Sequence, residues 1–174
     1  MVTPDLDAAD VRALLVEVGA ELDAVGVVAD LFLVGGAAVA LAYDARRLTR
    51  DVDAVFAPAT EVRVAAARVA GRHGLSDDWL NDAVKGFLPP GRPSSRTIME
   101  VPGLRVEVAE PRYLLALKLR AGRDEDVDDV RLLAGLAGVR TSTEAVDLLE
   151  STFPPSLLTA RVRFFAEEVF TPEP

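Results

Sequence analysis

The chain has 174 residues, the length of about one domain, and half of them are hydrophobic, which is enough for a buried core and excludes extensive disorder. The absence of cysteine excludes thiol catalysis, disulfides and cysteine-ligated metals, and the single histidine, His73, excludes a site with several histidine ligands. The net charge of −9 argues against nonspecific nucleic-acid binding by the whole surface, while a local basic cleft stays compatible with it.

The distribution of apolar residues bears on the location of the protein. No stretch approaches the roughly 20 consecutive apolar residues that span a bilayer. The first ten residues are acidic and lack the basic region that opens a signal peptide. The sequence therefore predicts a soluble cytoplasmic protein with no membrane partner.

Apolar periodicity predicts alternating helices and strands in the first half of the chain. A short apolar run ends in Gly35-Gly36, which indicates a buried strand that turns sharply into a helix. In chain order, the patterns predict a helix at 11–25, a strand at 31–34, a helix at 37–46, a strand at 51–56, a helix at 58–74 and a short helix at 77–86.

The second half is predicted to be a hairpin followed by helices. Pro102-Gly103 separates two strand-like runs, at 97–101 and 104–108, and is typical of a hairpin turn. Four helices follow: at 111–121, at 126–137, after the Thr141/Glu144 capping box, and after Pro154-Pro155. The fold class is therefore α+β, with one mixed sheet and a helical C-terminal half. We expect a single domain over 1–174, with a core at about 27–110 and a helical part at about 111–170.

Two acidic residues stand at alternate positions of the predicted second strand. Asp51 and Asp53 would project from the same face, with Cα atoms about 6.5–7 Å apart. Such carboxylates repel each other unless water or a cation neutralises them, and two carboxylates with phosphate oxygens suit Mg²⁺. The pattern fits either a metal site or a strand whose polar face meets water.

Two weaker candidate features for phosphate binding precede this pair in the sequence. Gly35-Gly36 before a helix would offer free N–H groups to a phosphate, or would simply form a tight turn. The cluster at 46–50 contains Arg46, Arg47 and Arg50, which could grip phosphates or could be a solvated helix end.

Further charged residues occur downstream. Glu107 could add a third carboxylate if its strand lies beside that of Asp51, or it could face water from an edge strand. Lys118 interrupts an apolar helix, where it either snorkels to water or meets an anion. Asp126 suits a helix N-cap.

Taken in order, these residues resemble the polymerase-beta-like nucleotidyltransferase superfold over residues 30–135. The resemblance consists of Leu33-Val34-Gly35-Gly36, fourteen intervening residues, and Asp51-Val52-Asp53-Ala54. The spacing Arg47-x-Thr49-x-Asp51-x-Asp53, and Lys118 followed by Arg123 and the 126–129 acids, are similar to the AbiEii- and MenT-like nucleotidyltransferase toxins and their uncharacterised bacterial relatives. The chain departs from the pattern at Gly36, where many members have Ser, and at Glu107, where some have Asp.

The resemblance implies a set of roles for the residues that match it. It implies catalytic roles for Asp51, Asp53, Lys118 and Asp126, nucleotide contacts from Gly35, Gly36, Arg47, Thr49, Lys118, Arg123 and Asp129, and one or two Mg²⁺ ions on Asp51, Asp53 and Glu107. Lys118 would contact the triphosphate or the leaving pyrophosphate, and Asp126 or Asp129 would position Lys118 or Arg123, or line the nucleotide pocket.

The implied activity is Mg²⁺-dependent transfer of a nucleotide from an NTP to an acceptor. The toxin-like relatives suggest tRNA 3′ ends as the acceptor and a cognate antitoxin as a protein partner, although the acidic balance offers few basic stretches, chiefly 46–50 and 112–123, for tRNA. The alternatives are transfer to a small molecule or a protein side chain, and a non-catalytic binding module that retains the fold. The base preference and the oligomeric state stay open.

Overall fold

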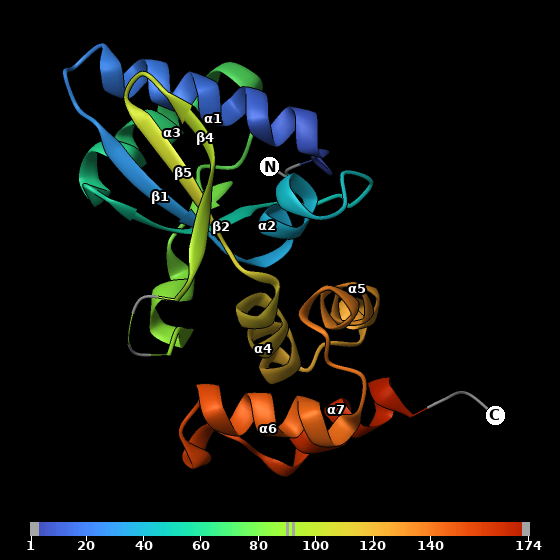
Figure 1. The fold of residues 1–174 in the computed structure, drawn as a ribbon. Coiled ribbons are helices and arrows are strands. Elements are labelled where there is room, and N and C mark those ends of the chain that lie inside the picture. The colour runs from blue at the N-terminus through green and yellow to red at the C-terminus, as the bar shows by residue number, and fades with distance from the viewer. Residues whose placement is uncertain (1–3, 90, 92, 172–174) are drawn as a thin grey trace. The chain divides into compact units, whose positions relative to one another are not determined.

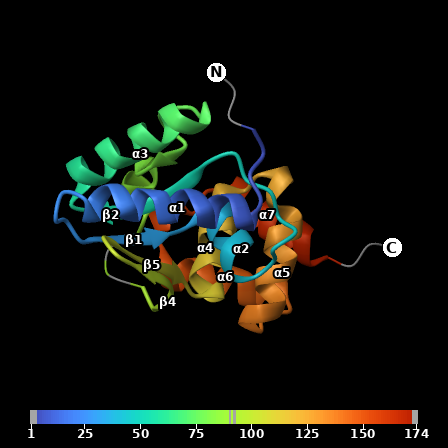
Figure 2. The ribbon, with the colours of Figure 1, turned by 90° about the horizontal axis from the view of Figure 1, so that it is seen from above.

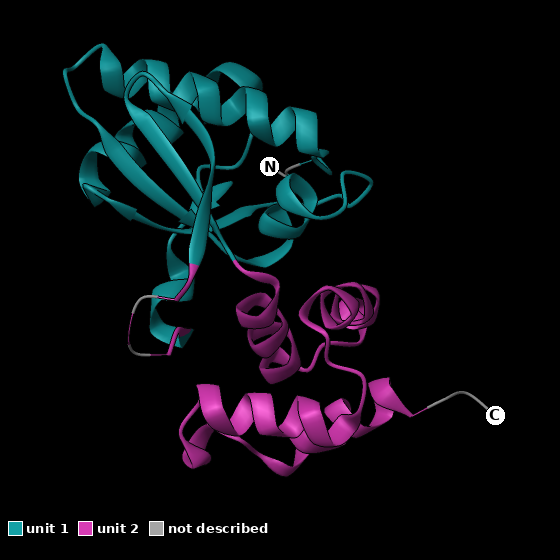
Figure 3. Ribbon diagram, viewed as in Figure 1, with its two compact units in different colours: residues 1–87, 95–109 teal, residues 88–94, 110–174 magenta. Residues whose placement is uncertain are grey.

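A computed structural model describes residues 4–89, 91 and 93–171. The chain divides into two compact units, which Figure 3 distinguishes by colour. Unit 1 comprises residues 1–87 and 95–109, and unit 2 comprises residues 88–94 and 110–174. Each unit has its own set of buried apolar side chains.

Unit 1 is built on a mixed β-sheet (Figure 1), whose strands pair in the order β3-β2-β1-β5-β4. The strands are β1 (Ala29–Leu33), β2 (Val52–Ala57), β3 (Leu80–Asn81), β4 (Ser95–Val101) and β5 (Leu104–Ala109). The central strand β1 is antiparallel to β2 and parallel to β5, while β3 runs parallel to β2 and β4 antiparallel to β5. The predicted mixed sheet and its hairpin are confirmed.

Helices of unit 1 cover one face of this sheet. The helices are α1 (Ala8–Asp23), α2 (Gly35–Ala42) and α3 (Ala59–His73), and α1 packs against α3 (Figures 1 and 2). Strand residues that face these helices, such as Leu31, Ala54 and Val106, are fully buried. Their neighbours on the opposite face, such as Phe32 and Asp53, are half-buried, because successive side chains of a strand point to opposite sides.

Unit 2 consists of helices that pack around α4 and α5. The helices are α4 (Pro111–Ala121), the 3₁₀ turn η2 (Asp124–Asp126), α5 (Val127–Ala137), α6 (Ser142–Thr152), the 3₁₀ turn η3 (Pro155–Leu157) and α7 (Ala160–Phe170). Thr141 and Glu144 form the capping box of α6 as predicted. Together the two units confirm the α+β class and the helical C-terminal half.

The structure departs from the sequence-based elements after α3. The short helix predicted at 77–86 is wrong, because the chain forms β3 and a 3₁₀ turn, η1 (Ala83–Phe87), there. Trp79 is fully buried and its indole N–H donates to the Ala66 carbonyl at 3.1 Å. The carbonyl of Trp79 accepts from the Val52 N–H at 2.6 Å, so this segment joins the sheet.

The boundaries of α1 and α2 also differ from the predicted ranges. α1 begins at Ala8 rather than 11, because Asp7 caps its first turn and Asp10 completes a capping box. α2 ends at Ala42 rather than 46, where Tyr43 donates its hydroxyl proton to the Ala109 carbonyl at 2.8 Å. A tertiary contact therefore ends a helix that local propensity would extend.

Candidate active site

The predicted acid pair lies at the start of β2. Asp53 is the second residue of that strand and is half-buried, and Asp51 directly precedes the strand and is exposed. Val52 and Ala54, which alternate with them, are fully buried on the helix-covered side. Asp53 therefore faces the opposite side of the sheet, where a ligand can reach it.

The glycine turn packs directly against Asp53. Gly35 has a left-handed φ of +68°, and a Cβ atom built on it would lie 2.9 Å from Oδ2 of Asp53. The backbone holds the two segments together, because the Val34 N–H donates to the Asp53 carbonyl at 3.0 Å. A side chain at position 35 is therefore disfavoured for two reasons: the positive φ angle of the backbone, and the carboxylate of Asp53 that a Cβ atom would meet.

The second glycine faces Thr49. A Cβ atom on Gly36 would lie 3.0 Å from Oγ1 of Thr49, so the hydroxyl of Thr49 fills the space above the turn. That hydroxyl donates to the carbonyl of Asp51 at 2.8 Å, and Thr49 is 9% exposed. Four residues predicted to belong to one site, Gly35, Gly36, Thr49 and Asp53, are thus brought together, with Asp51 attached through its backbone.

The helix that follows the turn offers backbone donors. α2 begins at Gly35, and its N-cap residue, Val34, makes no side-chain capping bond. The first N–H groups of a helix lack intrahelical partners, and they carry a partial positive charge. This end of α2 suits an anion such as a phosphate.

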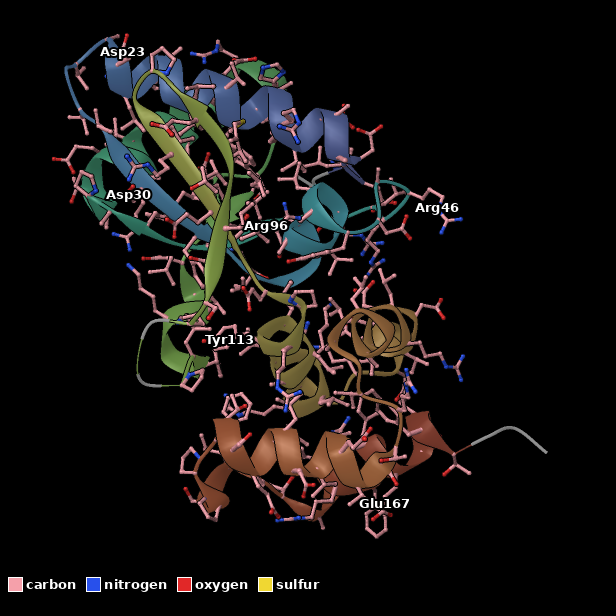
Figure 4. The ribbon with its side chains drawn as sticks, viewed as in Figure 1. Asp23, Asp30, Arg46, Arg96, Tyr113 and Glu167 are labelled. Atoms are coloured by element: carbon pink, nitrogen blue, oxygen red, sulfur yellow. The ribbon has the colours of Figure 1, made fainter. Side chains whose placement is uncertain are left out.

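The arginines of the loop after α2 are less available than the sequence suggested. Arg46 projects outward from the loop (Figure 4) and pairs with Asp44 at 3.0 Å, and this hydrogen bond holds the pKa of Asp44 below its ordinary value. Arg50 pairs with Asp5 at 3.1 Å. Arg47 is half-buried. Arg46 and Arg50 therefore already bind acids of this chain, which weakens their case as phosphate ligands.

Glu107 lies on the same face as Asp53 but not beside it. Its partner across the sheet is Phe32 of β1, so a whole strand separates β5 from β2. The backbones of strands two apart are separated by roughly 10 Å. The carboxylate of Glu107 accepts a hydrogen bond from the Ser95 hydroxyl at 2.9 Å. Across the described part of the chain, no three His, Asp or Glu side chains gather as a metal site, and the role of Glu107 stays a prediction.

Asn81 is a neighbour of Asp53 that sequence reasoning missed. It pairs with Asp53 across β2 and β3, and its side-chain oxygen accepts a hydrogen bond from the Ala83 N–H at 3.1 Å. The strand that carries it has two residues. Such a short strand gives no alternating pattern, so the sequence offers no signal that would place Asn81 here.

Unit 2 holds the other predicted site residues as a buried ionic cluster. The Lys118 ammonium lies 2.5 Å from Oδ1 of Asp126 and 2.7 Å from Oδ2 of Asp129, and each of the three side chains is about nine-tenths buried. Lys118 therefore meets anions within its own unit rather than snorkelling to water. Two carboxylates therefore share one ammonium.

The structure also places Asp126 and Arg123 relative to α5 and η2. Asp126 does occupy the N-cap position of α5, but its side chain makes no capping bond there, since it binds Lys118. Arg123 is exposed and precedes η2. Asp126 and Asp129 both bind Lys118, and which of them has a functional role stays a prediction.

The comparisons with known proteins identify no relative. No protein-family model matches the chain, and no curated protein or solved structure is significantly similar to it. Within the described residues, no helix is both long enough and apolar enough to cross a membrane.

Proposed function

We propose that this chain is a Mg²⁺-dependent nucleotidyltransferase that moves a nucleotide from an NTP to an acceptor. The close approach of the glycine turn to the carboxylate of Asp53, which leaves no room for a Cβ atom at position 35, supports the proposal. It joins a glycine turn at a helix start to an acid pair that the sequence places fourteen residues after the turn. Phosphate-binding donors and metal-binding oxygens in one place are what nucleotidyl transfer needs.

The donor set fits a magnesium ion. Asp51 and Asp53 would contribute carboxylate oxygens at the start of β2, and Mg²⁺ is commonly held by one or two carboxylates together with substrate phosphates. When bound, the ion would neutralise the triphosphate and favour in-line displacement at the α-phosphorus. The chain supplies the geometry: β1 pairing and the glycine turn fix Asp53, and the hydroxyl of Thr49 fixes the backbone of Asp51.

The remaining residues would bind the anionic part of the nucleotide. The uncapped start of α2 presents N–H groups to phosphate oxygens. By the resemblance, Lys118 contacts the triphosphate or the pyrophosphate. An ammonium has three N–H donors, and Asp126 and Asp129 accept two of them. The proposed catalysis is therefore positioning and charge stabilisation.

Label transfer tests this function. The chain is incubated with each α-labelled NTP and Mg²⁺, together with total RNA containing tRNA, small polyols or a cell lysate, and the labelled product is identified. Asp53→Asn, which keeps the shape and removes the charge, is expected to abolish transfer. Asp30→Asn is the matched control, because Asp30 is an exposed acid on the same sheet face (Figure 4), whose nearest ion pair, with Arg105, is 3.6 Å long.

The acceptor follows from where the label appears. Label at tRNA 3′ ends fits a toxin-like activity, with a cognate antitoxin as the expected protein partner. Label on a polyol or a protein identifies the alternative acceptors. Full transfer by Asp53→Asn rejects the mechanism, and no transfer to any acceptor favours a non-catalytic binding module.

A further inference from the structure

The loop between α2 and β2 has one residue whose polar groups are all engaged. The Thr49 N–H donates to the Leu6 carbonyl at 2.9 Å, and the Thr49 carbonyl accepts from the Leu6 N–H at 2.7 Å. The Thr49 hydroxyl donates to the Asp51 carbonyl at 2.8 Å. Leu6 is 4% exposed and Thr49 is 9% exposed, so these bonds are largely shielded from water.

The N-terminal side of this bridge is anchored in its own right. Asp7 directly follows Leu6 and forms the capping box that starts α1, and α1 packs on the sheet, α2 and α3. Asp5 also forms an ion pair with Arg50. This pair is exposed and therefore contributes little to stability. Residues 5–7 thus form a strap, fixed at α1, that crosses the loop at Thr49.

The strap is connected to the acid pair by a short chain of contacts. It holds the backbone of Thr49, and the side chain of Thr49 holds the backbone of Asp51 and occupies the space above Gly36. Asp53 is fixed independently, by its strand and by Gly35. Of the two carboxylates, Asp51 is therefore the one whose position depends on the strap.

We propose that Thr49 and Leu6 are positioning residues for Asp51, and that this strap sets the affinity of the acid pair for a divalent cation. The inference rests on the proposed function. Two carboxylates repel each other, and an ion binds them more tightly when both are already held in place. Loosening Asp51 adds an ordering cost to binding and leaves Asp53 unchanged.

The first test replaces the hydroxyl of Thr49. Mn²⁺ alone is titrated into the full chain, and the free ion is followed by electron paramagnetic resonance. Thr49→Val keeps the shape and loses the donor, so the Mn²⁺ dissociation constant is expected to rise roughly three- to tenfold, as for the loss of one hydrogen bond. Thr49→Ser retains the hydroxyl and is expected to restore most of the affinity.

The second test removes the backbone bond from the strap. Leu6→Pro lacks the N–H that donates to Thr49, whereas Leu6→Ala loses buried side-chain atoms and keeps that N–H. Leu6→Pro is expected to weaken Mn²⁺ binding, and Leu6→Ala is expected to lower the unfolding temperature with less change in Mn²⁺ affinity. Thr49→Val supplies the same comparison if Leu6→Pro does not fold.

The outcomes separate this inference from the proposed function. Failure of the unmodified chain to bind Mn²⁺ removes both. Mn²⁺ binding by the unmodified chain with equal affinity in Thr49→Val overturns the positioning role alone. Weaker binding in Thr49→Val with recovery in Thr49→Ser supports it, because a purely structural loss would lower the unfolding temperature without a matched change in Mn²⁺ affinity.

Discussion

At the scale of single residues, close approaches determine the geometry of the candidate site. A Cβ atom at position 35 would meet the carboxylate of Asp53, and one at position 36 would meet the hydroxyl of Thr49. Many members of the superfold that the sequence resembles have Ser at the position of Gly36. In this chain a side chain at position 36 would meet Thr49. These contacts make the turn sensitive to the addition of a single carbon atom.

The glycine turn yields a prediction about stability and metal binding. Gly35→Ala is expected to destabilise the chain by more than the about 1–2 kcal/mol of a left-handed alanine, since its Cβ also meets Asp53. Gly74→Ala is the control, with a φ of +67° and open space around its Cβ. Urea unfolding and Mn²⁺ titration check both variants. Equal losses of stability, or unchanged Mn²⁺ affinity in Gly35→Ala, would contradict the packing argument.

The buried cluster in unit 2 yields a second prediction at this scale. Lys118→Met leaves Asp126 and Asp129 buried without their shared ammonium, and we expect a loss of about 3–5 kcal/mol in the free energy of unfolding. Arg163→Met breaks an exposed ion pair with Glu150 and should cost at most about 1 kcal/mol. Urea unfolding of the two variants compares them, and similar losses would show that burial does not matter here.

At the scale of elements, ion pairs join segments that are distant in sequence. Arg63 of α3 lies 2.7 Å from Asp82, and so does Lys85 of η1, so one carboxylate links α3 to the segment after β3. These hydrogen bonds lower the pKa of Asp82 from 3.8 to about 2, and the bond from Arg63 has the larger effect. A carboxylate with a lowered pKa in the folded state stabilises the fold above its unfolded pKa.

This link predicts a pH-dependent effect of one substitution. Asp82→Asn is expected to lower the free energy of unfolding by about 0.5–1 kcal/mol at pH 7, because Arg63 and Lys85 are substantially exposed. The difference from the unmodified chain should shrink as the pH falls from about 4 towards 2, where Asp82 becomes protonated. Urea titrations at several pH values measure it, and a difference that does not change over this range would contradict the assignment.

At the scale of the whole molecule, each unit carries one group of the predicted site residues. Unit 1 holds the glycine turn and the acid pair, and unit 2 holds the cluster of Lys118, Asp126 and Asp129. The net charge of −9 means that acidic residues outnumber basic ones, 28 to 19. The nucleotide recognition that we propose would therefore depend on local donors and a metal ion rather than on the overall electrostatic field.

Ligand binding to the folded chain gives a prediction at this scale. Mg²⁺ with a non-hydrolysable NTP, at about 100 times its dissociation constant, should raise the unfolding temperature by roughly 5–10 °C. Asp53→Asn should lose the shift. Asp30→Asn should retain it, because Asp30 lies on the same sheet face but outside the proposed metal site. Differential scanning calorimetry measures the shift, and its persistence in Asp53→Asn would exclude the acid pair as the metal site.

The sequence by itself determined the features that depend on near neighbours. The Thr141/Glu144 capping box, the helix at 111–121 and the turn at Pro102-Gly103 were all predicted, because caps and turns are bonds between residues a few positions apart. Apolar periodicity was sufficient for the α+β class. The spacing of Asp51 and Asp53 also indicated that Asp53 lies on the face opposite the core.

Only the tertiary structure decided which of these features meet. Strand pairing brings Gly35 to Asp53 and Asn81 beside it, the strap at Leu6 engages Thr49, and helix packing encloses Lys118 between two acids. The segment predicted as a helix at 77–86 likewise forms β3 and η1, where Trp79 is buried and its carbonyl accepts from Val52. These contacts form between segments far apart along the chain, so their geometry follows from the packing of the core and leaves no local pattern in the sequence.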